Sequence, residues 1–137
     1  MAYWLVKSEP GAWSWDDHVK AGTAEWDGIR NHQADNNMKE MKVGDLAFFY
    51  HSVNEKQVVG IVEVVREHYP DSTDAKGRFG MVDFKIVEAL PEPVTLAQVK
   101  ADGRLDDLAL IRQSRLSVMP VDKKAWNIIC GLGGLKK

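Results

Sequence analysis

The chain has 137 residues, a formal net charge of −2 and one cysteine. This length suits one compact domain, and we expect residues 1–137 to form it. The charge excludes a protein that binds many phosphates along a nucleic-acid duplex, because such proteins carry a marked excess of basic residues. No apolar run approaches the ~18–20 residues of a membrane span, and a lone cysteine excludes an internal disulfide. We therefore expect a cytoplasmic protein without a membrane partner.

The first third of the sequence predicts one strand and two helices. Aromatic and β-branched residues make 2–8 typical of a strand. Ser14 followed by Asp17 has the spacing of a capping box, so a short helix should begin there and end near Gly22. A second helix is expected over 31–41, where apolar residues recur at spacings of four and three on one core-facing side.

The middle of the chain predicts a hairpin and a further strand. Both faces of 46–52 are largely apolar, which is typical of a strand covered on both sides. A loop at 53–56 leads to a returning strand over 57–67, in which Gly60 indicates a bulge or the close approach of another backbone. After a polar loop, residues 81–90 alternate as a half-buried strand.

The last third predicts two helices around a strand. The prolines of 91–93 should break the preceding strand, and a helix capped by Thr95 should follow. Residues 114–121 alternate as another strand, and Asp122 can cap a last helix that ends at the glycines of GLGG. About five or six strands with short helices between them predict an α+β domain whose sheet curls into a small barrel.

Neither catalysis nor metal binding is expected. His51 and Ser52 are neighbours on a strand and point to opposite faces, which excludes a dyad while both stay in that strand. Cys130 lies on an apolar helix face near a helix C-terminus, where the dipole disfavours a thiolate, so we expect it to be buried and inert. The four histidines show no paired spacing for a metal, and no glycine-rich loop precedes a helix to hold a cofactor.

Aromatic residues outside the obvious core pattern point to nucleobase binding. Trp26 stands in the polar stretch EWDGIRNHQADNN, where a core residue would have apolar neighbours, so we expect it to form a stacking wall. Trp26→Ala should then lose binding and keep the fold. Trp13 and Trp15 fit packing roles better. Residues 108–121 contain Arg112 and Arg115 and no acid, so they suit either a local anion contact or a solvated surface.

Four stretches together resemble the EVE domain. They are YWLVKSEP at 3–10, WDGIRNHQADNNMKEMKVGDLAFFYHS at 26–52, VGIVEVV at 59–65 and SRLSVMPV at 114–121. The similarity spans about residues 2–134, nearly the whole chain. That family belongs to the PUA-like superfamily and resembles the YTH readers of methylated adenosine. The resemblance implies a PUA-like barrel wrapped by helices, a pocket for a modified base, no cofactor, and a reader rather than an enzyme.

The resemblance also implies which residues bind the base. Matched to the family's motifs, the pocket would be formed by Lys7, Ser8, Trp26, Gly28, Arg30, Asn31, Tyr50, His51, Ser52, Arg115, Leu116 and Ser117. The first two end the first strand, the next four form one wall, the YHS triplet forms another, and the last three close the rim.

The implied function is a module that reads a modified base, such as a modified cytosine, in DNA or RNA. An effector protein encoded separately would act with it, and the oligomeric state stays open. Two alternatives also stay open. One is an enzyme acting on a nucleotide or RNA base with His51 as general base. The other is a protein-interaction module that uses exposed tryptophans.

Overall fold

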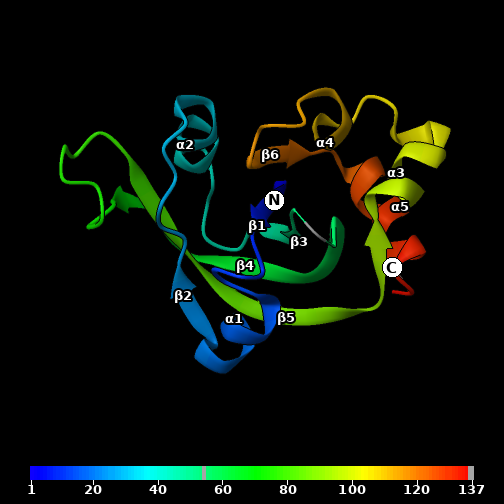
Figure 1. The fold of residues 1–137 in the computed structure, drawn as a ribbon, viewed down its shortest axis with the longest axis horizontal. Coiled ribbons are helices and arrows are strands. Elements are labelled where there is room, and N and C mark those ends of the chain that lie inside the picture. The colour runs from blue at the N-terminus through cyan, green and yellow to red at the C-terminus, as the bar shows by residue number, and fades with distance from the viewer. Residues whose placement is uncertain (54, 136–137) are drawn as a thin grey trace.

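A computed structural model describes residues 1–53 and 55–135 (Figure 1). The strands are β1 (Tyr3–Ser8), β2 (Thr23–Glu25), β3 (Leu46–His51), β4 (Gln57–Pro70), β5 (Gly80–Thr95) and β6 (Val118–Val121). The helices are α1 (Trp15–Ala21), α2 (His32–Lys39), α3 (Leu96–Ala101), α4 (Ala109–Arg112), α5 (Lys123–Leu132) and the 3-10 turn η1 (Gly103–Leu105). None of the helices in the described ranges has the length and apolar character to cross a membrane.

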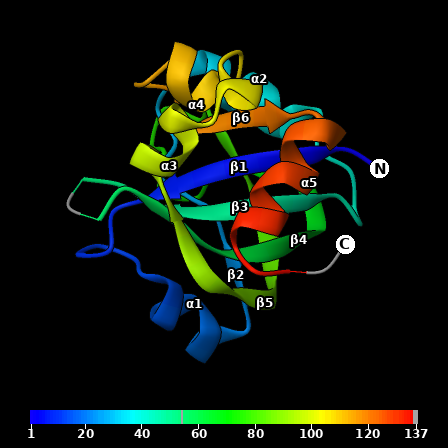
Figure 2. The same cartoon turned by 90° about the vertical axis from the view of Figure 1, so that its right-hand side faces the viewer.

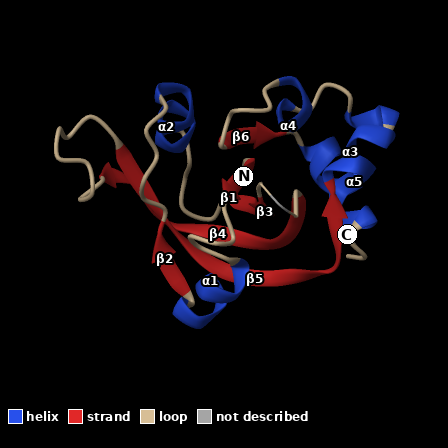
Figure 3. Cartoon of the chain, in the orientation of Figure 1, coloured by secondary structure: helices blue, strands red, loops and turns tan. Residues whose placement is uncertain are grey.

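The six strands form one mixed sheet in the order β2-β5-β4-β3-β1-β6. Strands β1 and β3 run parallel, and every other neighbouring pair is antiparallel. The long strands β4 and β5 bend and curl the sheet, while the helices lie around it (Figures 1 and 3). This confirms the predicted α+β fold, with an open curled sheet in place of a closed barrel.

Strand β3 is covered on both sides, as its sequence predicts. Phe48 stacks on Trp126 of α5 with ring centroids 3.8 Å apart, and Figure 2 shows α5 lying across β1 and β3. On the opposite face, Phe49 meets Trp15 of α1 edge to face with centroids 5.3 Å apart. The alternation of neighbouring strand residues therefore divides the core into two aromatic layers.

The predicted helix ends are confirmed where capping residues define them. The Ser14 side chain and Asp17 form the capping box of α1, and Gly22 ends that helix with φ 74°. Asn31 caps α2, and the predicted core face of that helix is buried. The Asp122 side chain accepts a hydrogen bond from the first turn of α5. Cys130 of α5 is buried, as expected.

The structure differs from the predicted elements at the prolines and in the shortest segments. Strand β5 continues through 91–93 to Thr95. Residues 91–93 have no partner on β4, because they lie between the pairs Gly60↔Ala89 and Val58↔Val94. The missing proline N–H groups therefore break no hydrogen bond between the two strands. Strand β2, η1 and α4 are too short to show a period in the sequence, and β6 is shorter than predicted. Asn54, in the loop expected at 53–56, lies outside the described residues.

Gly60 allows α1 to pack on the sheet. Register shifts flank it on both neighbouring strands, which confirms the predicted bulge. Its close neighbour, however, is a side chain rather than another backbone. A Cβ built on Gly60 would lie 2.3 Å from Cη2 of Trp15, well inside the contact distance of two carbon atoms.

We expect Gly60→Ala to destabilise the protein by about 1–3 kcal/mol, since the buried Trp15 ring and α1 must move to admit the methyl group. Urea unfolding at equilibrium measures this change. Gly131→Ala is the matched control, because a Cβ there meets no atom within 4 Å and alanine favours the helix. Equal stability of the two variants would contradict a close contact between Gly60 and the Trp15 ring.

Candidate functional site

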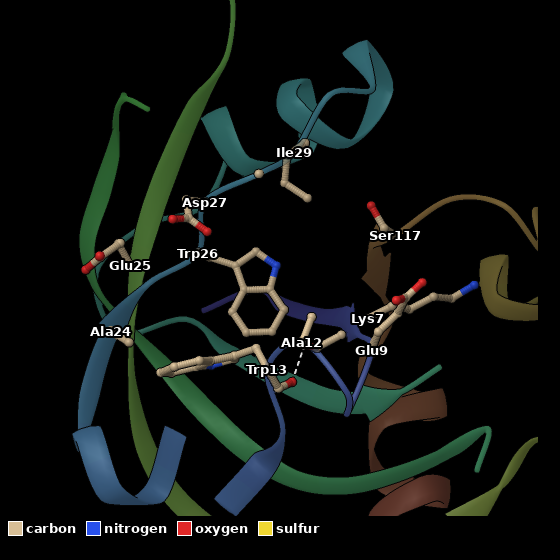
Figure 4. A pocket seen from close by; sticks show the side chains of 12 residues that line it. Lys7, Glu9, Ala12, Trp13, Ala24, Glu25, Trp26, Asp27, Ile29 and Ser117 are labelled. Atoms are coloured by element: carbon tan, nitrogen blue, oxygen red, sulfur yellow. Dashed lines mark hydrogen bonds between the residues drawn. The ribbon is translucent and has the colours of Figure 1, made fainter. Parts of the chain in front are cut away.

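A cavity of about 500 Å³ opens where β1 ends, beside the start of α1 and the segment that follows β2 (Figure 4). The predicted residues that line it are Lys7, Ser8, Trp26, Gly28 and Ser117. The lining residues that were not predicted are Glu9, Ala12, Trp13, Ala24, Glu25, Asp27 and Ile29. Of the lining residues that were not predicted, Glu9, Glu25, Asp27 and Ile29 lie directly next to predicted ones in the sequence, whereas Ala12, Trp13 and Ala24 do not.

Trp26 belongs to the core and to the cavity wall at once. Its side chain meets Phe49 and Phe84 edge to face, with centroids 5.3 and 5.5 Å away, and the residue is only 6% exposed. Its indole N–H has no hydrogen-bond partner among residues 1–53 and 55–135, and it faces the side of the cavity where Ile29 and Ser117 lie (Figure 4). The expectation that Trp26 lies outside the core is therefore wrong.

This burial also changes what Trp26→Ala is expected to do. The substitution would leave a void beside two phenylalanine rings, and voids of that size cost about 3–5 kcal/mol. Loss of binding in that variant would not separate a binding role from a folding role.

Trp13 forms a second aromatic wall and is held by a buried histidine. The Trp13 indole N–H donates to Nδ1 of His18 at 3.0 Å, which leaves Nε2 of His18 to donate to the Phe84 carbonyl at 2.8 Å. Burial lowers the pKa of His18, and its bond to Phe84 opposes this only in part. The Ser8 hydroxyl donates to the Trp13 carbonyl. The half-buried Trp13 is thus fixed as a wall as well as packed, which its sequence context did not show.

Lys7 and Ser117 form the side of the cavity opposite Trp26 (Figure 4). The Lys7 amide donates to the Ser117 carbonyl and its Nζ donates to the Ser114 carbonyl, both at 2.9 Å. Partial burial lowers the pKa of Lys7. An ammonium group has three donors, so Lys7 keeps hydrogen-bonding capacity for a ligand.

The cavity wall is rich in carboxylates. Glu9, Glu25 and Asp27 line it, and among residues 1–53 and 55–135 Lys7 is the one cationic lining residue. Burial, followed by the nearby charges of Asp71 and Glu25, raises the pKa of Asp27. Ionised carboxylates only accept hydrogen bonds, so the wall favours a ligand edge that donates them and disfavours a phosphate.

Asp71 holds the segment that carries Asp27 and Gly28. Its buried carboxylate accepts from the Gly28 amide at 2.8 Å, from Arg30 at 3.1 Å and from the Thr73 amide at 2.7 Å. Burial opposes ionisation, but the hydrogen bonds from Thr73, Gly28 and Arg30 outweigh it and lower the pKa to about 2. Gly28 has φ 80°, where a side chain would be strained, so this backbone conformation favours glycine.

The predicted YHS wall lies outside the cavity lining. Tyr50 is buried with Nζ of Lys7 5.8 Å from its ring centroid. His51 Nε2 accepts from the Trp15 amide at 2.9 Å, so its Nδ1 carries the proton and donates to Glu55 at 2.7 Å. The Ser52 amide donates to the Ser8 carbonyl. These residues anchor α1 and β1, because β3 pairs with β1 behind the cavity rather than facing into it.

The remaining predicted residues lie beside the cavity rather than in its lining. Arg30 turns away to pair with Asp71 and to donate to Thr73 at 3.0 Å. Asn31, Arg115 and Leu116 line a separate cleft next to the cavity. The sequence places these residues close to the lining, but it does not show the partners that orient them.

The sequence matches the EVE domain family over residues 2–132. Human thymocyte nuclear protein 1 is 31% identical over 166 residues, which cover 96% of this chain and 73% of that protein. Its mouse counterpart is 34% identical, over 95% of this chain and 73% of that protein.

Solved structures share the fold. A Rhodopseudomonas palustris protein is 53% identical and superposes with a TM-score of 0.94, covering 100% of this chain and 96% of that one. Human THYN1, solved in complex with DNA containing 5-methylcytosine, is 30% identical with a TM-score of 0.90 and full coverage of both chains. An ASCH protein of Zymomonas mobilis has a TM-score of 0.58, 11% identity and coverage of 96% and 95%, a likeness of fold alone.

We expect Asp71→Asn to lower the free energy of unfolding by about 1–3 kcal/mol at pH 6, because the amide NH₂ cannot accept from the donors around Asp71. The pKa of Asp71 is depressed in the folded state, so its carboxylate contributes stability above its ordinary value of 3.8. That contribution is lost as pH falls toward about 2.

Urea unfolding of both proteins at several pH values tests this. The gap between wild type and Asp71→Asn should shrink from pH 5 to pH 2.5. Asp107→Asn, at a fully exposed carboxylate, is the control and should change little at either pH. A gap that stays constant with pH would contradict the role given to the Asp71 charge.

Proposed function

Since the chain belongs to the EVE domain family, we propose that it binds DNA and takes one modified cytosine base into the cavity beside Trp26. One observation carries this proposal: two tryptophans, Trp13 and Trp26, and several carboxylates line the same open cavity. The THYN1 complex with DNA containing 5-methylcytosine supports the choice of base.

The tryptophans supply the stacking energy that a displaced base requires. In Figure 4 the ring of Trp26 is seen face on and that of Trp13 is seen from its edge, so the two planes are not parallel. A base can then stack on one indole and set its edge against the other. Stacking contributes about 1–3 kcal/mol per base, which offsets the few kcal/mol lost when a base leaves its neighbours.

The polar lining complements the edge of cytosine. The exocyclic amine of cytosine donates hydrogen bonds, and the carboxylates of Glu25 and Asp27 accept them. The acceptor atoms of the base edge suit donors such as the Trp26 indole N–H and the Ser117 hydroxyl. Thymine carries a carbonyl where cytosine carries the amine, so it would set an acceptor against carboxylates.

The methyl group itself adds little affinity. Burial of one such carbon contributes ~0.8 kcal/mol, or about a fourfold preference for 5-methylcytosine over cytosine. Stronger selectivity would require a polar group that only the modified base satisfies.

The proposed module binds the base without changing it chemically. Both ring nitrogens of His51 are hydrogen-bonded to Trp15 and Glu55, which argues against His51 as a general base for a bound ligand. Binding to RNA and a separately encoded effector stay predictions.

We expect single-stranded DNA with one 5-methylcytosine to bind about fourfold more tightly than the same strand with cytosine. A strand with thymine at that position should bind at least tenfold more weakly than the methylated strand, because its carbonyl meets the carboxylates. Fluorescence anisotropy of labelled strands measures all three. Equal binding of thymine and 5-methylcytosine would rule out recognition of the amine, and a changed nucleoside by mass analysis would rule out a reader.

We expect Trp26→Phe to weaken binding of the methylated strand by roughly tenfold, because it removes the indole N–H and part of the stacking surface. The phenyl ring still packs on Phe49 and Phe84, so the protein should fold. Trp126→Phe is the matched control, since Trp126 is also buried but stacks on Phe48 in the other aromatic layer. Equal losses of affinity in the two variants would contradict a specific role for Trp26.

A further inference from the structure

A second, polar cleft of about 350 Å³ lies between the start of α2 and the segment that follows α4. Asn31 and Gln33 line it on one side, and Arg112, Gln113 and Arg115 line it on the other. The two sides are joined by a hydrogen bond from Nε2 of Gln33 to Oε1 of Gln113 at 2.9 Å. In contrast to the base cavity, the lining of this cleft contains two arginines and, within the part of the chain that the structure describes, no carboxylate.

The cleft and the base cavity are lined by neighbouring residues of the chain. Ser117 lines the cavity and Leu116 lines the cleft, so neighbouring residues of one segment serve both. Likewise, Ile29 lines the cavity and Asn31 lines the cleft, and their Cα atoms lie at most ~7 Å apart because only one residue separates them. At this boundary, Nζ of Lys7 donates to the Ser114 carbonyl at 2.9 Å.

The two arginines of the cleft differ in how they are held. Nε of Arg112 donates to the Asp106 carbonyl at 2.9 Å, and its guanidinium pairs with Asp107 at 3.4 Å. The exposed side chain of Arg115 has no hydrogen bond or ion pair with any residue of 1–53 or 55–135. Residues 108–121 contain no acid, so the guanidinium charge of Arg115 has no counterion nearby in the sequence.

We propose that Arg115 binds a backbone phosphate of the nucleic-acid strand, next to the nucleotide whose base enters the cavity. This inference rests on the proposed function. A base that enters the cavity stays attached to its strand and brings its flanking phosphates to the cavity mouth. The carboxylates of Glu9, Glu25 and Asp27 repel those phosphates from the cavity itself, and the arginine-lined cleft is the adjoining place that attracts them.

Binding of a strand then has two separate contributions. The base contributes stacking and edge hydrogen bonds, which depend little on salt. The phosphate contributes a charge contact whose counterion release makes binding salt-dependent, by a slope of about 0.7 per phosphate on a single strand. A short methylated DNA strand and free 5-methyl-2′-deoxycytidine, which has no phosphate, therefore report on different parts of the surface.

The test compares Arg115→Gln with Arg112→Gln on these two probes across a range of salt concentrations. We expect Arg115→Gln to weaken strand binding roughly tenfold at low salt and to lower the salt slope by about 0.7, with nucleoside affinity unchanged. Arg112→Gln is the matched control, because its guanidinium is already engaged by Asp106 and Asp107, and it should lower the slope by less than half as much.

An unchanged slope in Arg115→Gln would overturn the inference, and so would an equal loss of nucleoside binding, which would place Arg115 in the base site. Failure of the proposed function gives a different result. Wild type would then bind methylated and unmodified strands equally and ignore the nucleoside, while the Arg115 effect on slope would persist. A wild-type protein that binds no strand would overturn both.

Discussion

The walls of the base cavity depend on ring contacts with the side chain of Phe49. Trp15 and Trp26 meet it edge to face at centroid distances of 5.3 Å, and His18 and His51 do so at 5.7 Å. Such contacts align the positive edge of one ring with the face of another and fix the ring planes. Through His18 the same cluster also fixes Trp13. The two walls of the cavity are therefore held by the core rather than by mobile loops.

A protein with a net charge of −2 can bind nucleic acid in this way because its charges are divided between two places. The carboxylates line the cavity, where they complement the donors of a base edge. The arginines lie in the adjoining cleft, where we propose that the strand passes. Such a surface is expected to make few phosphate contacts, so its affinity should depend mainly on the base and only weakly on duplex backbone.

Local signals in the sequence predict much of this fold. The capping box at Ser14, the cap at Asp122 and the two apolar faces of β3 each follow from residues within a few positions of one another. The site is harder to predict, because its geometry depends on distant partners. Trp26 looks exposed among polar neighbours, yet Phe84 buries it from far along the chain. Arg30 and His51 look like ligand-binding groups until Asp71 and the Trp15 amide are seen to engage them.

We propose that a modified cytosine lies against Trp26. The most direct measurement is the ¹H–¹⁵N spectrum of the tryptophan indole groups during titration with 5-methyl-2′-deoxycytidine. We expect the indole signals of Trp26 and Trp13 to move together with one binding curve, while that of Trp126, in the opposite aromatic layer, stays in place. Movement of the Trp126 signal alone, or no movement of any indole signal at saturating nucleoside, would contradict this proposal.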